Sequence, residues 1–190
     1  MNHLAHALVA HRAGGSIVGN LLGDFVKGDP RDRWEGALLE GILLHRRVDA
    51  LTDAHPAFHR SRARIRPELR RWAGILVDVF YDHLLARRWE EYCDQPLRGF
   101  ADDVYAALRQ EWDVLPDRMT GFASYMIDTD LLVAYREEAG VARALAGLSR
   151  RVRRGAPLRG AVAELARERA GLDTDFAEMF PDLLRASLEE

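Results

Sequence analysis

Residues 72–89, WAGILVDVFYDHLLARRW, decide the fold of this chain. Read as a helix, the segment carries apolar side chains around nearly its whole circumference, and such a helix lies at the centre of a protein. Asp78 and Asp82 interrupt the pattern one turn apart, on a stripe that they share with Ile75. Two carboxylates in a dry setting repel each other and lose hydration, so they need a cation nearby, either an arginine or a metal ion.

Helical signals dominate the rest of the chain, separated by glycine and proline breakers. No segment shows the alternating pattern of a strand. We therefore expect an all-α protein, a single-domain helical bundle over residues 1–190, with RRVRRGAP (150–157) as a loop. The expected helices cover residues 2–12, 17–28, 34–52, 57–65, 67–92, 100–115, 119–138, 141–152, 158–170 and 174–188.

Composition narrows the class of protein. A chain of 190 residues is long enough for one domain with a substantial core. The formal net charge of -3 argues against a dedicated nucleic-acid binder. A single cysteine, Cys93, cannot form an internal disulfide and favours a reducing compartment. No apolar run approaches the roughly 20 residues of a membrane span, and no targeting segment is visible, so we expect a cytoplasmic protein without membrane or nucleic-acid partners.

A second polar stripe lies within GILLHRRVDALTDAHP (41–56). In a helix, His45 and Asp49 fall in the same sector of about 60° as Ile42, so the pair should face inward. A histidine beside an aspartate on one helix is often only a hydrogen-bonded pair, and that alternative stays open.

Two N-terminal segments add further polar residues. Asn20 and Asp24 lie one turn apart on a side shared with apolar residues, and His3 and His6 lie one turn apart in NHLAHA (2–7). The combined constellation suits manganese, iron, magnesium or zinc, because imidazole and carboxylate groups from packed helices are ligands of these ions. Its members are His6, Asp24, His45, Asp49, Asp78, Asp82 and His83, so the site comes mainly from residues 1–90.

Arginines supply the alternative to a metal. A buried salt-bridge network could neutralise the same carboxylates, with Arg46 or Arg47 as the countercharge. Beside a metal, Arg46 could instead bind a phosphate oxygen.

Further arginines gather at Arg60, Arg62, Arg64, Arg66, Arg70 and Arg71, and again at Arg150, Arg151, Arg153 and Arg154. Such clusters are usually solvated faces, but they can also dock an acidic partner.

Four motifs in this order resemble one known family, the acyl carrier protein phosphodiesterases. They are NHLAHA (2–7), GNLLGDFVKG (19–28), GILLHRRVDALTDAHP (41–56) and DVFYDHLL (78–85). The resemblance covers most of residues 1–90, and LLVAYRE and LSRRVRR further on fit it more loosely. It implies an all-helical fold related to the HD-type metal phosphohydrolases, although the chain has no HD dipeptide and the HD ligands do not transfer one for one.

The resemblance also implies an activity. Members of the family cleave the phosphodiester that joins 4'-phosphopantetheine to a serine of holo acyl carrier protein, with manganese favoured and magnesium as the alternative. The carrier protein is acidic, which would give the arginine clusters a purpose. Two other functions stay open: an HD-like phosphohydrolase of a nucleotide or other small phosphoester, and a non-catalytic helical binder of an acidic partner.

The expected roles follow from both arguments. We expect the metal ligands to come from Asp24, His45, Asp78, Asp82 and His6, with Asp49 orienting His45 and Asn20 supporting the ligands. We expect Asp24, Arg46 and His83 to take part in catalysis, with His83 as a proton donor or as a packing residue. The expected partner-binding residues are Arg60, Arg62, Arg64, Arg66, Arg150 and Arg151.

Overall fold

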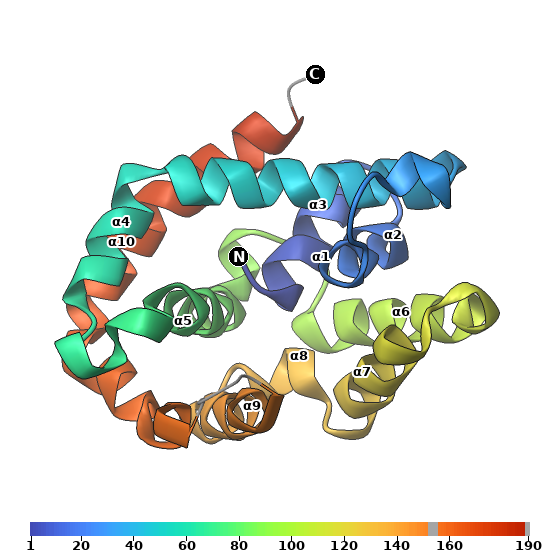
Figure 1. Ribbon diagram of the computed structural model, residues 1–190. Coiled ribbons are helices and arrows are strands. Elements are labelled where there is room, and N and C mark those ends of the chain that lie inside the picture. Colours follow the sequence, from blue (N-terminus) through green and yellow to red (C-terminus); the bar gives the residue numbers. More distant parts are fainter. Residues whose placement is uncertain (152–155, 189–190) are drawn as a thin grey trace.

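A computed structural model describes residues 1–151 and 156–188. Throughout this described part the chain forms helices and turns without a strand, which confirms the all-α prediction. Figure 1 shows α1 near the middle of the molecule and α10 running around its edge, beside α4 and toward the C-terminus. The main helices are α1 (His3–Arg12), α2 (Ile17–Leu22), α3 (Gly36–Ala54), α4 (Pro56–Arg64), α5 (Ala73–Arg87), α6 (Leu97–Gln110), α7 (Asp117–Asp128), α8 (Leu131–Ala134), α9 (Glu138–Arg151) and α10 (Val162–Leu188).

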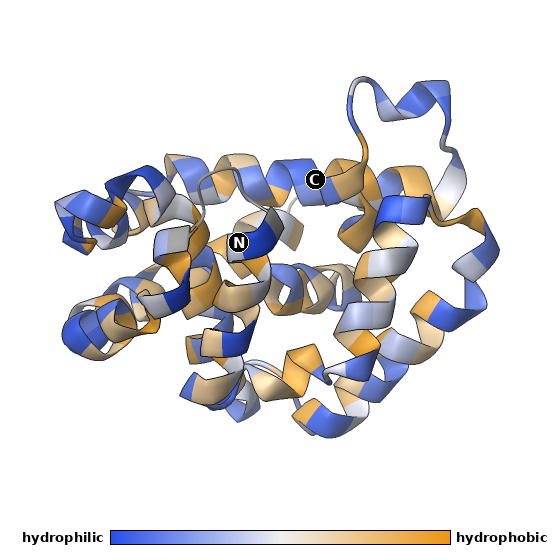
Figure 2. Ribbon diagram, turned by 60° about the horizontal axis from the view of Figure 1, so that its bottom comes forward, coloured by the Kyte–Doolittle hydropathy of each residue, from blue (hydrophilic) through white to orange (hydrophobic). Residues whose placement is uncertain are grey.

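Helix α5 is central, as its sequence predicts. Its buried residues point in nearly every direction around the axis, and they include Leu76, Val79 and Phe80. Most other helices carry hydrophobic and hydrophilic residues side by side along their length, as expected of helices with one exposed face (Figure 2). The hydrophobic core therefore forms around α5, and polar residues on α5 are held away from solvent.

A carboxylate of α5 accepts hydrogen bonds from the first turn of α1. The backbone amides of Leu4 and Ala5 donate to the two oxygens of Asp82, at 2.8 and 3.1 Å. The first amides of a helix have no partner within the helix and carry a partial positive charge, so a carboxylate there stabilises the helix. This contact positions α1, and with it His6, over α5.

Helix α2 is shorter than expected. It starts at Ser16, whose hydroxyl accepts from the amide of Gly19, and ends at Leu22, followed by a 3-10 turn η1 (Gly23–Phe25). The helix packs closely on α3: a Cβ on Gly41 would come within 2.7 Å of the α2 backbone, so only glycine permits this approach. Asp24 consequently lies on the turn rather than on a long helix.

Other expectations about helix boundaries were also wrong. Within the expected helix 67–92 only Ala73–Arg87 is α-helical, between the 3-10 turns Pro67–Trp72 and Trp89–Glu91. The segment 158–188 forms a short 3-10 turn and then one continuous helix, α10, instead of two helices. Gly171 lies inside α10, where the absence of a side chain makes room for Arg64. The Arg64 guanidinium would lie 2.4 Å from a Cβ at that position. The expected helix 119–138 is divided at Asp130, which adopts the left-handed conformation with a φ of 48°.

The structure also bears on membrane association. Within the described residues, every helix is either too short or too polar to cross a bilayer.

Candidate metal centre

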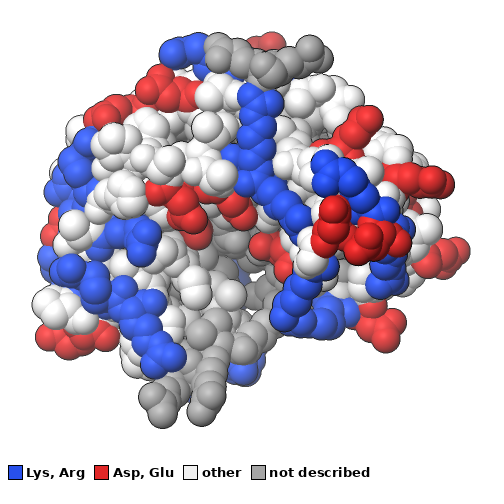
Figure 3. Space-filling model, turned by 45° about the horizontal axis from the view of Figure 1, so that its top comes forward, with Lys and Arg blue, Asp and Glu red and all other residues white. Residues whose placement is uncertain are grey.

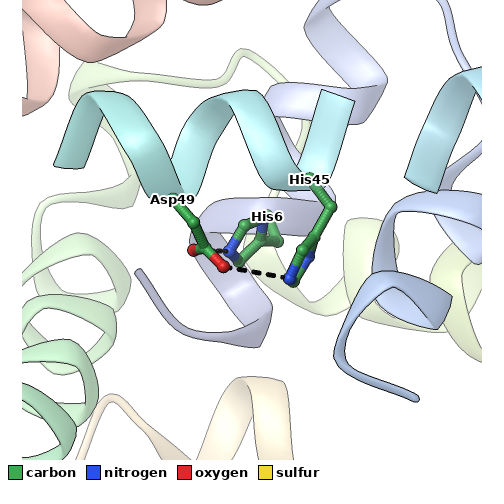
Figure 4. A group of neighbouring side chains, drawn as sticks. All are labelled: His6, His45 and Asp49. Carbon is green, nitrogen blue, oxygen red and sulfur yellow. Dashed lines mark hydrogen bonds and ion pairs between the residues drawn. The ribbon is translucent and has the colours of Figure 1, made fainter. Parts of the chain in front are cut away.

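Three side chains from two helices converge between α1 and α3. His6 Nε2 lies 3.1 Å from Asp49 Oδ1, and His45 Nε2 lies 3.2 Å from Asp49 Oδ2 (Figure 4). The ligand atoms of these three residues all lie within 4.8 Å of one another. The i, i+4 spacing of His45 and Asp49 places both on the same face of α3, and α1 brings His6 to that face.

The two imidazoles are buried and stacked, with ring centroids 4.0 Å apart. Burial lowers the pKa of His6 to about 4, so this ring is neutral at pH 7. Its Nδ1 lies 2.9 Å from the side-chain oxygen of Asn20 and can donate to it. In that tautomer, Nε2 has no hydrogen and turns its lone pair toward the Asp49 carboxylate. In this tautomer a cation held between Nε2 and the carboxylate would satisfy both groups; in the other tautomer, Nε2–H donates to Asp49 directly.

Asp49 is poised as an anion. Burial acts to raise the pKa of this carboxyl, but the contacts with His45 and His6 outweigh it, and the net pKa lies well below the ordinary value. A carboxylate that stays charged, with two imidazole rings beside it, is a suitable ligand set for a divalent ion.

Asp24 approaches the cluster from η1. Its Oδ1 lies 3.6 Å from His45 Nε2, and its Oδ2 lies 3.6 Å from His3 Nδ1. The following loop is held by Arg46, which donates to the carbonyl oxygens of Val26 at 3.2 Å and Gly28 at 2.8 Å. In the structure, Arg46 therefore holds the loop that follows Asp24.

Asp78 borders the same region. One of its oxygens lies 3.1 Å from the amino group of Met1, and that amino group lies 3.7 Å from Asp49. Burial raises the pKa of Asp78, and the Met1 amino group opposes the increase without cancelling it. Asp78 and Asp24 both line a cavity of about 270 Å³ that opens beside the cluster.

Two predicted site residues lie elsewhere. Both oxygens of Asp82 accept from α1 amides, so Asp82 caps a helix instead of taking the ligand position predicted for it. His83 directs Nδ1 to the carbonyl oxygen of Tyr135 at 2.7 Å and lines a different cavity, together with Arg87 and Arg136. This placement supports packing rather than proton donation to the cluster.

The arginine alternative is not what the structure shows. Arg46 binds backbone carbonyls, and Arg47 donates to the carbonyl of Ala186 at 2.6 Å. The ion pairs observed for Asp24, Asp49 and Asp78 are made with histidines or with the Met1 amino group. Among the described residues, no guanidinium occupies the centre of the carboxylates.

Most of the first arginine cluster pairs within the chain. Arg60 and Arg64 each approach Asp175 at 2.9 Å, and Arg66 approaches Glu164 at 2.5 Å. On the face shown in Figure 3, basic and acidic side chains interleave instead of forming a region of one sign. Three of the predicted docking arginines, two on α4 and Arg66 two residues beyond its end, thus pair with α10.

Of the remaining predicted docking residues, Arg62 and Arg150 have exposed side chains, and the side chain of Arg151 is not described. Arg62 lies over the ring of Phe58, with its guanidinium carbon 5.8 Å from the centroid, and is exposed. Arg150 is exposed as well. The side chain of Arg151 and residues 152–155, which include Arg153 and Arg154, lie outside the described part of the chain.

Sequence reasoning missed two members of this region, His3 and the amino group of Met1. The spacing of His3 and His6, one turn apart in α1, was a usable signal for His3. The amino group gave no sequence signal, because its position depends on how α1 packs against α5.

Comparisons with known proteins show which family the chain belongs to. The model of the acyl carrier protein phosphodiesterase family matches residues 1–183. A protein of that name from Serratia proteamaculans is 35% identical over 193 residues, covering 100% of this chain and 99% of the relative. One from Escherichia coli O157:H7 is 37% identical over 188 residues, covering 97% and 96%. One from Klebsiella pneumoniae is 36% identical over 189 residues, with the same coverage.

No solved structure gives a significant match, so the relation to HD-type phosphohydrolases stays a prediction. The family match and the full-length relatives are sufficient by themselves: the chain belongs to the acyl carrier protein phosphodiesterase family.

Proposed function

We propose that this protein is a metal-dependent phosphodiesterase that releases 4'-phosphopantetheine from the serine of holo acyl carrier protein, leaving the apo carrier protein. The observation that carries the proposal is the cluster of two buried imidazoles, His6 and His45, around the half-exposed carboxylate of Asp49, with no arginine at its centre among the described residues. Relatives that match over nearly their whole length are named for this activity.

In this proposal the metal ligands are His6, His45, Asp49 and Asp24. Two imidazoles and two carboxylates suit Mn²⁺, with Mg²⁺ as the alternative. Bound there, the ion would polarise a phosphoryl oxygen and lower the pKa of a coordinated water. Asn20 holds the His6 ring through Nδ1, which keeps Nε2 directed at the ion.

The neighbouring residues position the substrate and exchange protons. Arg46 holds the loop that carries Asp24 and so preserves the spacing of the ligands. Asp78 and His3 line the cavity beside the centre, and each can exchange a proton with the leaving serine oxygen. Arg62 and Arg150 are the predicted docking residues that remain exposed without an acidic partner among the described residues.

The direct test is mass spectrometry of holo acyl carrier protein after incubation with the purified protein and Mn²⁺. We expect a loss of mass equal to phosphopantetheine, abolished by a chelator and by His45→Ala. An unchanged carrier protein, together with hydrolysis of a nucleotide or another small phosphoester, would favour the HD-like alternative. No hydrolysis and no bound metal would favour the non-catalytic binder.

A further inference from the structure

An open cavity lies beside the metal centre, with Asp24 common to both. Its volume is about 270 Å³, and Asp24 and Asp78 lie in its lining. The remaining walls are mainly apolar and come from segments far apart in the sequence: Phe25, Ile75, Val79, Phe122 and Leu148. A phosphodiester held at the centre would therefore have one substituent beside an apolar surface.

A second cavity continues from the first. It has a volume of about 30 Å³ and shares Asn2, His3, Phe122 and Leu148 with the open cavity. About 10–15 Å³ is enough for one water-sized group, so this inner space admits the end of a thin chain and nothing wide. Polar groups line it as well, since the side-chain amide of Asn2 donates to the hydroxyl of Tyr135 at 2.8 Å.

Small residues on α9 keep the inner cavity open. Ala144 and Gly147, one turn apart, both line it. A Cβ on Gly147 would lie 3.4 Å from the hydroxyl oxygen of Tyr125, so even one methyl group there would reach the opposite wall. A larger side chain at Ala144 would fill the space by the same geometry.

We propose that the two cavities form one subsite for the pantetheine arm, with the phosphate at Asp24 and the thiol end in the inner cavity; this inference rests on the proposed function. The arm is a narrow chain with a dimethyl branch and two amides. The apolar walls suit its hydrocarbon parts, and the polar groups around Asn2 and Tyr135 suit its amides. Binding energy from this remote part of the substrate would help to hold the phosphodiester in place at the centre.

The test compares the product 4'-phosphopantetheine with inorganic phosphate, by calorimetric titration in the presence of Mn²⁺. The ratio of their dissociation constants measures what the arm contributes. We expect the wild-type protein to bind the product at least about tenfold more tightly than phosphate. Ala144→Leu should bring the ratio close to one, and Gly147→Ala, a smaller addition that is more easily accommodated, should lower it by about threefold.

Ala142→Leu is the matched control. It makes the same substitution on α9 at a position that lines neither cavity, so the ratio should stay within about twofold of wild type. A wild-type ratio near one, or a ratio that Ala144→Leu and Gly147→Ala leave unchanged, would overturn the subsite.

An assay of holo acyl carrier protein cleavage distinguishes a failure of this inference from a failure of the proposed function. If holo acyl carrier protein is cleaved while the α9 variants keep the wild-type ratio, the function stands and the subsite is wrong. If the ratio falls as expected but the wild-type protein leaves the carrier protein intact, the cavity binds a pantetheine compound and the proposed reaction is wrong.

Discussion

At the scale of single residues, the centre depends on which nitrogen of each imidazole faces the carboxylates. Asn20 occupies Nδ1 of His6, and burial keeps the ring neutral at pH 7, since its pKa is lowered to about 4. The lone pair on Nε2 then points at Asp49. In that tautomer the lone pair and the carboxylate face each other without a hydrogen between them, and a bound cation would satisfy both.

Asp49→Asn tests this argument. The amide removes the charge from the carboxylate that joins His6 to His45, so we expect the affinity for Mn²⁺ to fall by at least about 100-fold. Asp53→Asn is the matched control, because Asp53 lies one turn further along α3 and is exposed. Titration with Mn²⁺ measures both variants. An equal affinity in the two variants would remove Asp49 from the ligand set.

Asp82→Asn should act on stability rather than on the metal. Burial raises the pKa of Asp82 to about 7, while the α1 amides oppose that increase. Because the folded pKa is raised, the proton's contribution to stability is fully present below about pH 3.9 and is lost as the pH rises through 7.

Urea unfolding of Asp82→Asn across this pH range is therefore informative. We expect a loss of about 1 kcal/mol at pH 5, because an amide cannot accept from both Leu4 and Ala5. The fall in stability between pH 5 and 8 should also become smaller than in wild type. A loss of Mn²⁺ affinity as large as that of Asp49→Asn would return Asp82 to the ligands.

At the scale of elements, the functional residues depend on contacts that hold turns and helices in place. The turn η1 carries Asp24, yet it is too short to be stable by itself. Arg46 of α3 donates to two carbonyl oxygens in the following loop, at Val26 and Gly28. The position of Asp24 is therefore set by a helix that already carries His45 and Asp49.

Arg46→Ala should loosen this loop and leave the bundle folded. We expect faster amide hydrogen exchange across residues 23–28 and a fall of about tenfold in kcat/KM on holo carrier protein. Arg31→Ala is the control, since Arg31 belongs to the same region and pairs with Asp29. Unchanged exchange with a large loss of activity would instead support the predicted contact of Arg46 with phosphate.

The junction of α4 and α10 is a second such contact. Asp175 is buried on α10 and accepts from Arg60, Arg64 and Ser61. Burial acts to raise the pKa of Asp175, but the bonds from these groups outweigh it and the net pKa is lowered. The pairing therefore stabilises the fold above about pH 3.9, the pKa of an unfolded aspartate, and is lost as the pH falls through the lower folded value.

Asp175→Asn should lower the free energy of unfolding by about 2 kcal/mol at pH 7, a figure reduced for the partial exposure of both arginines. The difference from wild type should shrink toward pH 3. Chemical unfolding at both pH values measures it, and Asp173→Asn, which removes a half-exposed carboxylate of α10 that pairs with Arg88, serves as the control for loss of a surface ion pair. A constant difference at both pH values would show that charge does not hold this junction.

At the scale of the whole molecule, the centre joins three separate parts of the chain. His6 comes from α1, Asp24 from η1, and His45 and Asp49 from α3. Helix α1 packs on both α5 and α3, and η1 packs on α3, so the site forms only when these helices are assembled (Figure 1). A ligand bound there stabilises the entire fold, because it has no comparable affinity for the unfolded chain.

Metal removal should therefore lower the melting temperature. At a free Mn²⁺ concentration about 100 times the dissociation constant, the folded state gains about 2.7 kcal/mol. For a chain of this length that corresponds to a shift of roughly 5–10 °C. Calorimetry with Mn²⁺ and with a chelator measures the shift, and His45→Ala should abolish it. An equal shift in His45→Ala would place the ion at another site.

The sequence by itself determined the fold class, the central position of α5 and the family, because periodicity and local motifs lie within single segments. It also identified His6 and His45 as polar residues on buried faces and pointed to Asp24, Asp49 and Asp78 beside them, although the structure leaves the side chains of these three carboxylates partly exposed. Helical periodicity indicates which face a residue occupies, but not which partner packs on that face.

Only the tertiary structure decided how those residues are shared between roles. Asp82 and Asp78 lie on one stripe of α5, yet the start of α1 occupies Asp82 and leaves Asp78 beside the cavity. Arg60 and Arg64 read as an exposed basic cluster, yet α10 brings Asp175 to them across more than a hundred residues. Contacts between residues so distant in sequence arise from the packing of whole helices, which no local pattern encodes.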